Sequence, residues 1–192
     1  MRMRDERAKQ VIEVWKTIVS VQQHFNDIEM RIRSIFVTVL LALFASIGFL
    51  LDKNLSLEVW IFKVRFITLI PLVGIVGTVL FYFMDRHWYH RLLIGSVLHG
   101  IEIERKYRSE LPELSLSDAI GKESPFQPKG FIWLVACIVV REERFRTTGK
   151  IHSDGKIELF YKSMMLLLFL TFVVLAAIGG ITFAREPHVL PY

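Results

Sequence analysis

Histidines at short helical spacing are the side chains in this sequence whose types and positions best suit chemistry. His87 and His90 are three residues apart, and His99 and Glu102 repeat that spacing. Such pairs lie on one face of a helix and can bind a metal ion. No further cluster of ligands in the sequence completes a coordination shell, so we expect interfacial and surface histidines and no metal-binding residue. A membrane-bound enzyme that uses these histidines is the less favoured alternative.

The acidic residues and the single cysteine do not form a catalytic constellation. Glu102 and Glu104 fall on different helix faces, and we expect them to pair with neighbouring basic residues. Glu142 and Glu143 stand among arginines, which is typical of a solvated face. Cys137 lies in an apolar run, so we expect it to be buried and inert, and one cysteine rules out an intrachain disulfide. Without a phosphate-binding loop, a GxSxG motif or a glycine-rich dinucleotide turn, we expect no catalytic residue, no cofactor and no enzymatic activity.

Long uncharged segments predict a membrane protein, whose spans set the positions of the histidines and acids described above. The chain has 192 residues, of which 53% are hydrophobic and 22% charged, and the two kinds are segregated. Residues 34–51 and 66–84 carry no charge over 18 and 19 residues, which is enough for a helix to cross a bilayer. A third span is expected within 161–184, where 164–184 is uncharged. Because the span interiors lack charged residues, we expect no proton relay or charged transport path. A hydrophobic pore or a wide oligomeric pore is compatible with the sequence.

A transmembrane hairpin is the expected structure of residues 34–84. Residues 52–58 are interpreted as a short polar turn, so the first two spans run antiparallel. Lys63 and Arg65 precede the second span, and we expect them to reach the headgroups rather than conduct ions. Small residues four apart offer faces for close packing of the spans, Gly74 with Thr78 and Ala176 with Gly180.

The N-terminal segment 1–33 carries an apolar heptad pattern. Its members follow a 3,4 spacing, which is typical of a helix that packs along another helix. They are Val11, Val14, Ile18, Val21, Phe25, Ile28 and Ile32, and Ile35 continues them into the first span. The partner is open at this point: the chain's own helices, a second copy of the chain, or the lipid surface.

The region 85–160 is expected to be mainly helical. The second span continues as a helix beyond the membrane, followed by a loop over 111–129 with a short helix at 115–120. The apolar run 130–140 is too short to span and fits an interfacial helix, a core helix, a buried strand or a re-entrant segment. Residues 153–156 suit either a hairpin turn or a helix start with Ser153 as the N-cap, and we favour the helix start.

Charge distribution predicts the topology. Residues 1–33 and 85–162 hold 20 of the 24 Lys and Arg residues, and the remaining 4 fall outside these ranges. Cytoplasmic loops are rich in Lys and Arg, so we expect a multi-pass inner-membrane protein with a cytoplasmic N-terminus and an external tail at 185–192. The net charge of +5 serves topology and contact with anionic lipid, and we expect no nucleic-acid partner.

Several patterns resemble two families of small bacterial helical membrane proteins. These patterns are the basic amphipathic N-terminal helix, the hairpin, and a second span that runs into LLIGSVLHGIEIE (92–104) and ELPEL (110–114). Over residues 10–115 the chain is similar to SLATT-type two-span effector domains and RipA-like oligomeric membrane proteins, although its third span departs from a two-span arrangement. The resemblance implies a homo-oligomer of the inner membrane, in some cases a defence effector that permeabilises the membrane.

The sequence therefore predicts an all-α membrane protein with three transmembrane helices and a cytoplasmic helical extension. We expect it to self-associate in the lipid bilayer as a non-enzymatic pore-forming or membrane-perturbing component, with antiphage defence as a candidate role and a cytoplasmic protein as a possible partner. The alternative is a scaffold or accessory subunit of a larger membrane complex.

Overall fold

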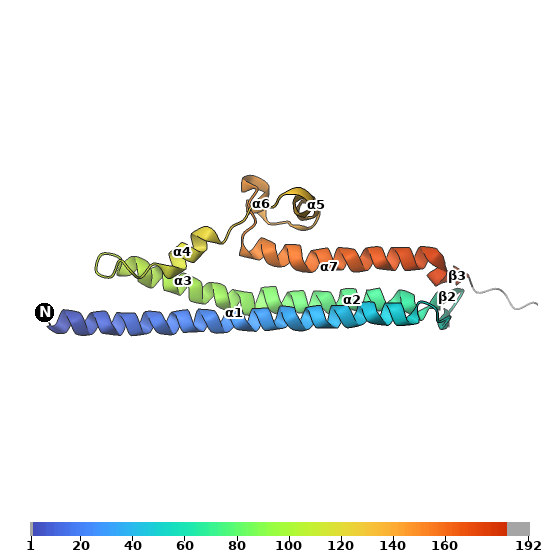
Figure 1. Ribbon diagram of the computed structural model, residues 1–192, viewed down its shortest axis with the longest axis horizontal. Helices are drawn as coiled ribbons and strands as arrows, with labels where there is room; N and C mark the ends of the chain where they lie inside the picture. The colour runs from blue at the N-terminus through green and yellow to red at the C-terminus, as the bar shows by residue number, and fades with distance from the viewer. Residues whose placement is uncertain (1, 184–192) are drawn as a thin grey trace, which may run out of the picture. The chain divides into compact units, whose positions relative to one another are not determined.

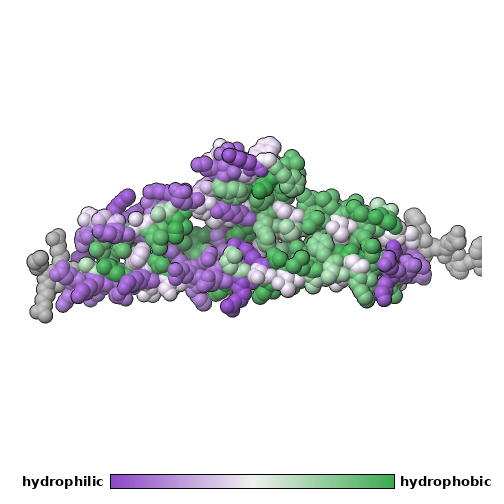
Figure 2. Space-filling model, viewed as in Figure 1, coloured by the Kyte–Doolittle hydropathy of each residue, from purple (hydrophilic) through white to green (hydrophobic). Residues whose placement is uncertain are grey.

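The computed structural model describes residues 2–183 and divides them into two compact units. Residues 2–34 and 81–162 form the first, called the polar unit, and residues 35–80 and 163–183 form the second, called the apolar unit. Hydrophobic side chains cover the helices of the apolar unit, whereas hydrophilic side chains are abundant over the polar unit (Figures 1 and 2). The tail expected at 185–192 lies outside the described residues.

Three helical runs are long and apolar enough to cross a membrane. The first is α1 (Arg2–Leu50), and the second joins α2 (Phe66–Phe83), the π-helical η1 (Met84–Tyr89) and α3 (His90–Lys106). The third joins α7 (Ser153–Leu175) to a second π-helical segment, η2 (Ala176–Gly180). The expectation of three long apolar helices is confirmed, and the helix past the second span is present as well.

The polar unit also contains three short helices. These are α4 (Leu116–Glu123), α5 (Gly130–Val139) and α6 (Glu143–Thr148). The short helix expected near residue 115 is therefore present, and the apolar run is a helix rather than a strand. Since α7 begins at Ser153, the helix start is confirmed. A backbone bridge between Phe126 and Ile151, with N–O distances of 3.1 and 2.8 Å, closes this part of the chain.

A small sheet in the apolar unit departs from the expected all-α fold. Strands β1 (Ser56–Val59), β2 (Phe62–Arg65) and β3 (Ile181–Phe183) pair antiparallel in the order β1-β2-β3. The prediction of a plain polar turn at 52–58 is wrong because four-residue strands pair around a two-residue loop. Pairing of Val59 with Phe62 leaves only Trp60 and Ile61 in that loop, and Trp60 takes a φ of 56°. Tight hairpin loops need such positive φ values.

Arg65 ties this hairpin to the end of the first helix. Its guanidinium donates hydrogen bonds to the carbonyls of Leu51 and Lys53 at 3.1 and 3.3 Å. Both carbonyls lie in the turn that follows α1, so Arg65 fixes this turn to β2. The contact of Lys63 and Arg65 with lipid headgroups stays a prediction.

Close packing around two glycines holds the apolar unit together. A Cβ atom at Gly74 would lie 3.1–3.2 Å from the side chains of Leu168 and Leu43. Thr78 is buried and its hydroxyl donates to the Gly74 carbonyl at 2.7 Å. At Gly180 a Cβ atom would collide with Thr68, and Ala176 is half-buried in η2. Three of the four predicted small packing residues are therefore buried, which agrees with close helix contact.

Candidate functional site

A buried acid immediately after the second span lies at the centre of the polar unit. Asp85 has no exposed surface and belongs to η1, where the helix widens between α2 and α3. Such π-helical turns occur often at functional sites, since one extra residue changes the direction of the side chains. The Asp85 carboxylate accepts two hydrogen bonds from Arg33 of α1, at 2.7 and 3.2 Å, and one from the Tyr161 hydroxyl of α7 at 3.0 Å. One carboxylate therefore joins three helices.

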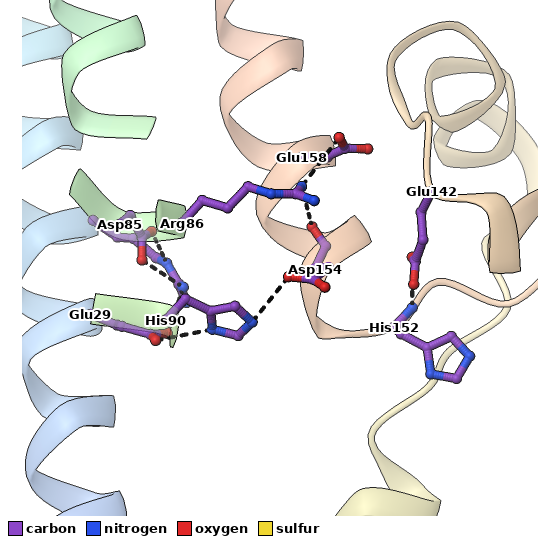
Figure 3. Close-up of polar contacts among 9 residues, drawn as sticks. Glu29, Asp85, Arg86, His90, Glu142, His152, Asp154 and Glu158 are labelled. Carbon is purple, nitrogen blue, oxygen red and sulfur yellow. Dashed lines mark hydrogen bonds and ion pairs between the residues drawn. The ribbon is translucent and has the colours of Figure 1, made fainter. Parts of the chain in front are cut away.

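A second acid–base contact lies one helical turn away. Glu29 of α1 accepts a hydrogen bond from Arg33 at 2.8 Å and contacts Nδ1 of His90 at 3.1 Å. The other ring nitrogen of His90, Nε2, faces the Asp154 carboxylate at 3.4 Å without hydrogen-bond geometry. Figure 3 shows the imidazole between these two acids. His90 therefore bridges α1 and the first turn of α7.

Arg86 makes the third link between the helices. Its guanidinium lies 3.2 Å from Glu158 and donates to the backbone carbonyl of Asp154 at 3.3 Å (Figure 3). Glu158 also accepts hydrogen bonds from Lys162 at 3.0 Å and from the backbone N–H of Arg141 at 2.8 Å. Burial acts to raise the pKa of Glu158, but these donors outweigh it and hold the pKa below the ordinary value.

These residues form one cluster, called the ion network. Its acids are Glu29, Asp85, Asp154 and Glu158, and its permanent cations are Arg33, Arg86 and Lys162. The three permanent cations match the three buried acids in number, and the fourth acid, Asp154, has a 40% exposed side chain. Buried ions need such compensation, because an uncompensated buried charge costs several kcal/mol. The ion network thus forms a joint between α1, α7 and the helical run that contains η1.

An open cavity adjoins the ion network. It has a volume of about 550 Å³, within the range of small-molecule sites. Glu29, Arg33, His90 and Lys156 contribute charged or titratable groups to its wall, and α3 contributes apolar side chains such as Leu93 and Val97. The Lys156 ammonium donates to the Ser124 carbonyl at 2.6 Å. An occupant of this cavity would touch the same side chains that join the helices.

Glu104 has a role that the sequence analysis did not identify. Its carboxylate accepts hydrogen bonds from the backbone N–H groups of Ser117 and Asp118 and from Trp15 Nε1, at 2.9, 3.1 and 3.1 Å. Burial acts to raise the pKa of Glu104, but these donors hold it below the ordinary value. Instead of pairing with neighbouring basic residues, Glu104 caps the start of α4 and fixes it to α1 and α3.

The apolar pattern of α1 divides between two faces. Val11, Ile18 and Ile32 are buried within the polar unit, and Phe25 is half-buried. Trp15, Gln22 and Glu29 alternate with them and bond to residues of the polar unit. Val14 and Val21 instead expose 51% and 39% of their surface, Ile28 is half-buried, and Ile35 beyond the unit is 50% exposed. Half of the heptad pattern therefore packs within the chain. The other half forms a more exposed face, called the outer stripe, which consists of Val14, Val21, Ile28 and Ile35.

The expectation of surface histidines holds for His87 and His99 and is wrong for His90. His90 is buried in the ion network, whereas His87 is exposed and packs its ring on Phe83 at 5.6 Å. His99 lies 3.9 Å from Glu102 on the surface. Within residues 2–183, no group of three or more His, Cys, Asp or Glu side chains is arranged to hold a metal ion.

Sequence reasoning missed most of the ion network, although two signals were present. Glu29 and Arg33 have the i, i+4 spacing of a helical ion pair, one turn before the first span. Asp85 is the first charge after the second span. An unpaired carboxylate close to a bilayer costs free energy. This cost favours a basic partner for Asp85 near the end of a neighbouring span, where Arg33 stands. Nothing in the sequence indicated the contribution of Tyr161 from α7.

Comparison with protein-family models, with curated proteins and with solved structures found no match for this chain.

Proposed function

We propose that this chain is an inner-membrane protein whose polar unit lies in the cytoplasm and whose copies associate to perturb or permeabilise the bilayer. The observation that carries the proposal is the outer stripe of α1. Intrachain packing uses one apolar face of this helix and leaves Val14, Val21 and Ile35 exposed at heptad-related positions. A second copy of the same helix is the partner that a heptad pattern suits best.

Helices that belong to both units would let a signal received by the polar unit act on the assembly in the membrane. Helix α1 contributes to both units, and α2 passes through η1 into α3 without a break. The ion network joins the polar-unit parts of these helices through Arg33 and Asp85. Binding of a small molecule or a protein segment in the cavity would change contacts of Glu29, Arg33 and His90. In this proposal, the ion network is the element whose equilibrium between two arrangements a cytoplasmic signal would shift.

Cysteine crosslinking in membranes tests the association. In a Cys137→Ser background, Val21→Cys places a thiol on the outer stripe, and Gln23→Cys places one on another exposed face of the same helix. We expect Val21→Cys to give covalent dimers and Gln23→Cys to give few. Equal crosslinking at both positions would mean random collision, and the absence of dimers at Val21 would favour the scaffold or accessory-subunit alternative.

A further inference from the structure

Helix α5 exposes a continuous apolar face. Phe131, Trp133, Leu134 and Ile138 expose 77%, 52%, 53% and 63% of their surface, and Cys137 is also exposed. At 100° per residue these five positions fill one arc of about 160°. The opposite side holds the buried Ala136 and Val139, and Ile132 between them exposes 50% of its surface. The expectation of a buried thiol is wrong, because Cys137 lies on the exposed arc. The hydrophobic surface at the position of α5 is visible in Figure 2.

Exposed basic residues flank α5 in the sequence. Residues 129–150 contain five Lys and Arg residues and two Glu residues. All five cations are exposed: Lys129, Arg141, Arg144, Arg146 and Lys150. An apolar face bordered by Lys and Arg, with a Trp in the apolar part, is typical of a helix that lies in the membrane interface. Each cation near an anionic leaflet adds to the attraction.

The attachment of α5 gives its depth relative to the third apolar helix. The Arg141 N–H, two residues after the end of α5, donates to Glu158 of α7 at 2.8 Å. Lys162 is the last charge in α7 before the uncharged run. Glu158 and residue 163 are separated by five residues, which is roughly 7.5 Å along a helix. The chain just after α5 is therefore held to α7 a little more than one helical turn before its uncharged run begins.

We propose that α5 lies on the cytoplasmic leaflet, with Phe131, Leu134 and Ile138 in the acyl boundary and the flanking cations among anionic headgroups. The acyl boundary matches the apolar face of α5, and anionic headgroups match its flanking cations. A soluble protein partner would have to offer both features. The inference rests on the proposed function for the membrane insertion of the apolar helices and for the cytoplasmic side of the polar unit. It is independent of the pore and of self-association.

The native Cys137 gives a direct test in the intact chain. A nitroxide attached to it in vesicles of phosphatidylcholine and phosphatidylglycerol should collide more with oxygen than with a water-soluble nickel chelate. In a Cys137→Ser background, Thr147→Cys in the exposed part of α6 should show the opposite preference. Val76 of α2 exposes 61% of its surface, and a label on Val76→Cys gives the reference value for a lipid environment.

The outcomes separate the alternatives. Equal access of Cys137 and Thr147 labels to the nickel chelate would overturn the proposal, as would a Cys137 label protected from both reagents, which indicates a protein partner. Loss of the oxygen preference at Val76 would show that the spans are not in lipid, a failure of membrane insertion rather than of α5 alone. The double variant Phe131→Asp, Ile138→Asp should move the Cys137 label toward water while leaving the Val76 label unchanged.

Discussion

At the scale of single residues, Asp85 is the side chain on which the polar unit depends most. It is fully buried, and its two oxygens serve an arginine from α1 and a tyrosine from α7. Its neighbour Arg33 also bonds to Glu29. A buried ion pair contributes little net energy when complete, but the loss of one partner leaves the other charge uncompensated. The stability of the joint therefore depends on keeping all members together.

Replacing Asp85 by Asn should lower the free energy of unfolding by about 1–3 kcal/mol, because Arg33 and Tyr161 lose a charged acceptor in a buried site while Glu29 still pairs with Arg33. Thermal unfolding in detergent measures this. The exposed pair Glu13–Lys16 provides the control, and Glu13→Gln should have a much smaller effect. If Asp85→Asn unfolds like the unaltered protein, the ion network has no structural role.

The Glu104 cap should make α4 sensitive to acid. Its donors hold the pKa below the ordinary value of a glutamate, about 4.3. A depressed pKa contributes stability that is complete above the ordinary pKa and is lost as pH falls through the folded-state pKa. Fluorescence of Trp15, with the other three Trp residues replaced by Phe, should report release of the carboxylate in that range. Glu104→Gln should remove this step, and an unchanged step would assign it to another acid.

At the scale of elements, α1 shows how far a heptad pattern can be interpreted. The spacing predicted a helix that packs on other helices, and the helix runs to Leu50. The pattern did not reveal that Trp15, Gln22 and Glu29 share the inner face with Val11 and Ile18, because polar residues are not counted in an apolar seam. Their partners are distant in sequence, and local periodicity carries no information about them.

The strands were missed for a related reason. The segment 56–65 is short and contains Glu58, Lys63 and Arg65, so its composition resembles a loop. Its third strand comes from residues 181–183, more than a hundred residues later. Strand pairing depends on distant partners, whereas the starts of α4 and α7 were predicted from local residues such as Ser115 and Ser153.

Two glycines of α3 give a matched test of helix packing. A Cβ atom at Gly100 would lie 2.7 Å from the Gln22 amide and 2.8 Å from the Ser117 hydroxyl, whereas nothing lies within 4 Å of one at Gly95. Gly100→Ala should therefore weaken the contact of α3 with α1 and α4, and Gly95→Ala should be neutral or stabilise by up to about 1 kcal/mol through helix propensity. Hydrogen exchange of α4 measures the difference. Equal protection in both variants would contradict the close approach.

At the scale of the whole molecule, two units of different character share continuous helices. The apolar unit is held by close packing at Gly74 and Gly180, and the polar unit is held by the ion network and the Glu104 cap. Hydropathy predicted the three apolar helices, since uncharged length is a direct physical requirement of the bilayer. The joint between helices could not be predicted in the same way, because each of its residues is ordinary within its own segment.

We propose that several copies of the chain act together on the bilayer. Release of a trapped dye from vesicles, measured against the number of protein copies per vesicle, tests it most directly. The account predicts that the release rate rises more steeply than the first power of copy number, and that a variant with Val14 and Val21 both replaced by Asp releases little dye while its spans remain inserted. Release proportional to copy number, or no release at any density, would contradict the claim.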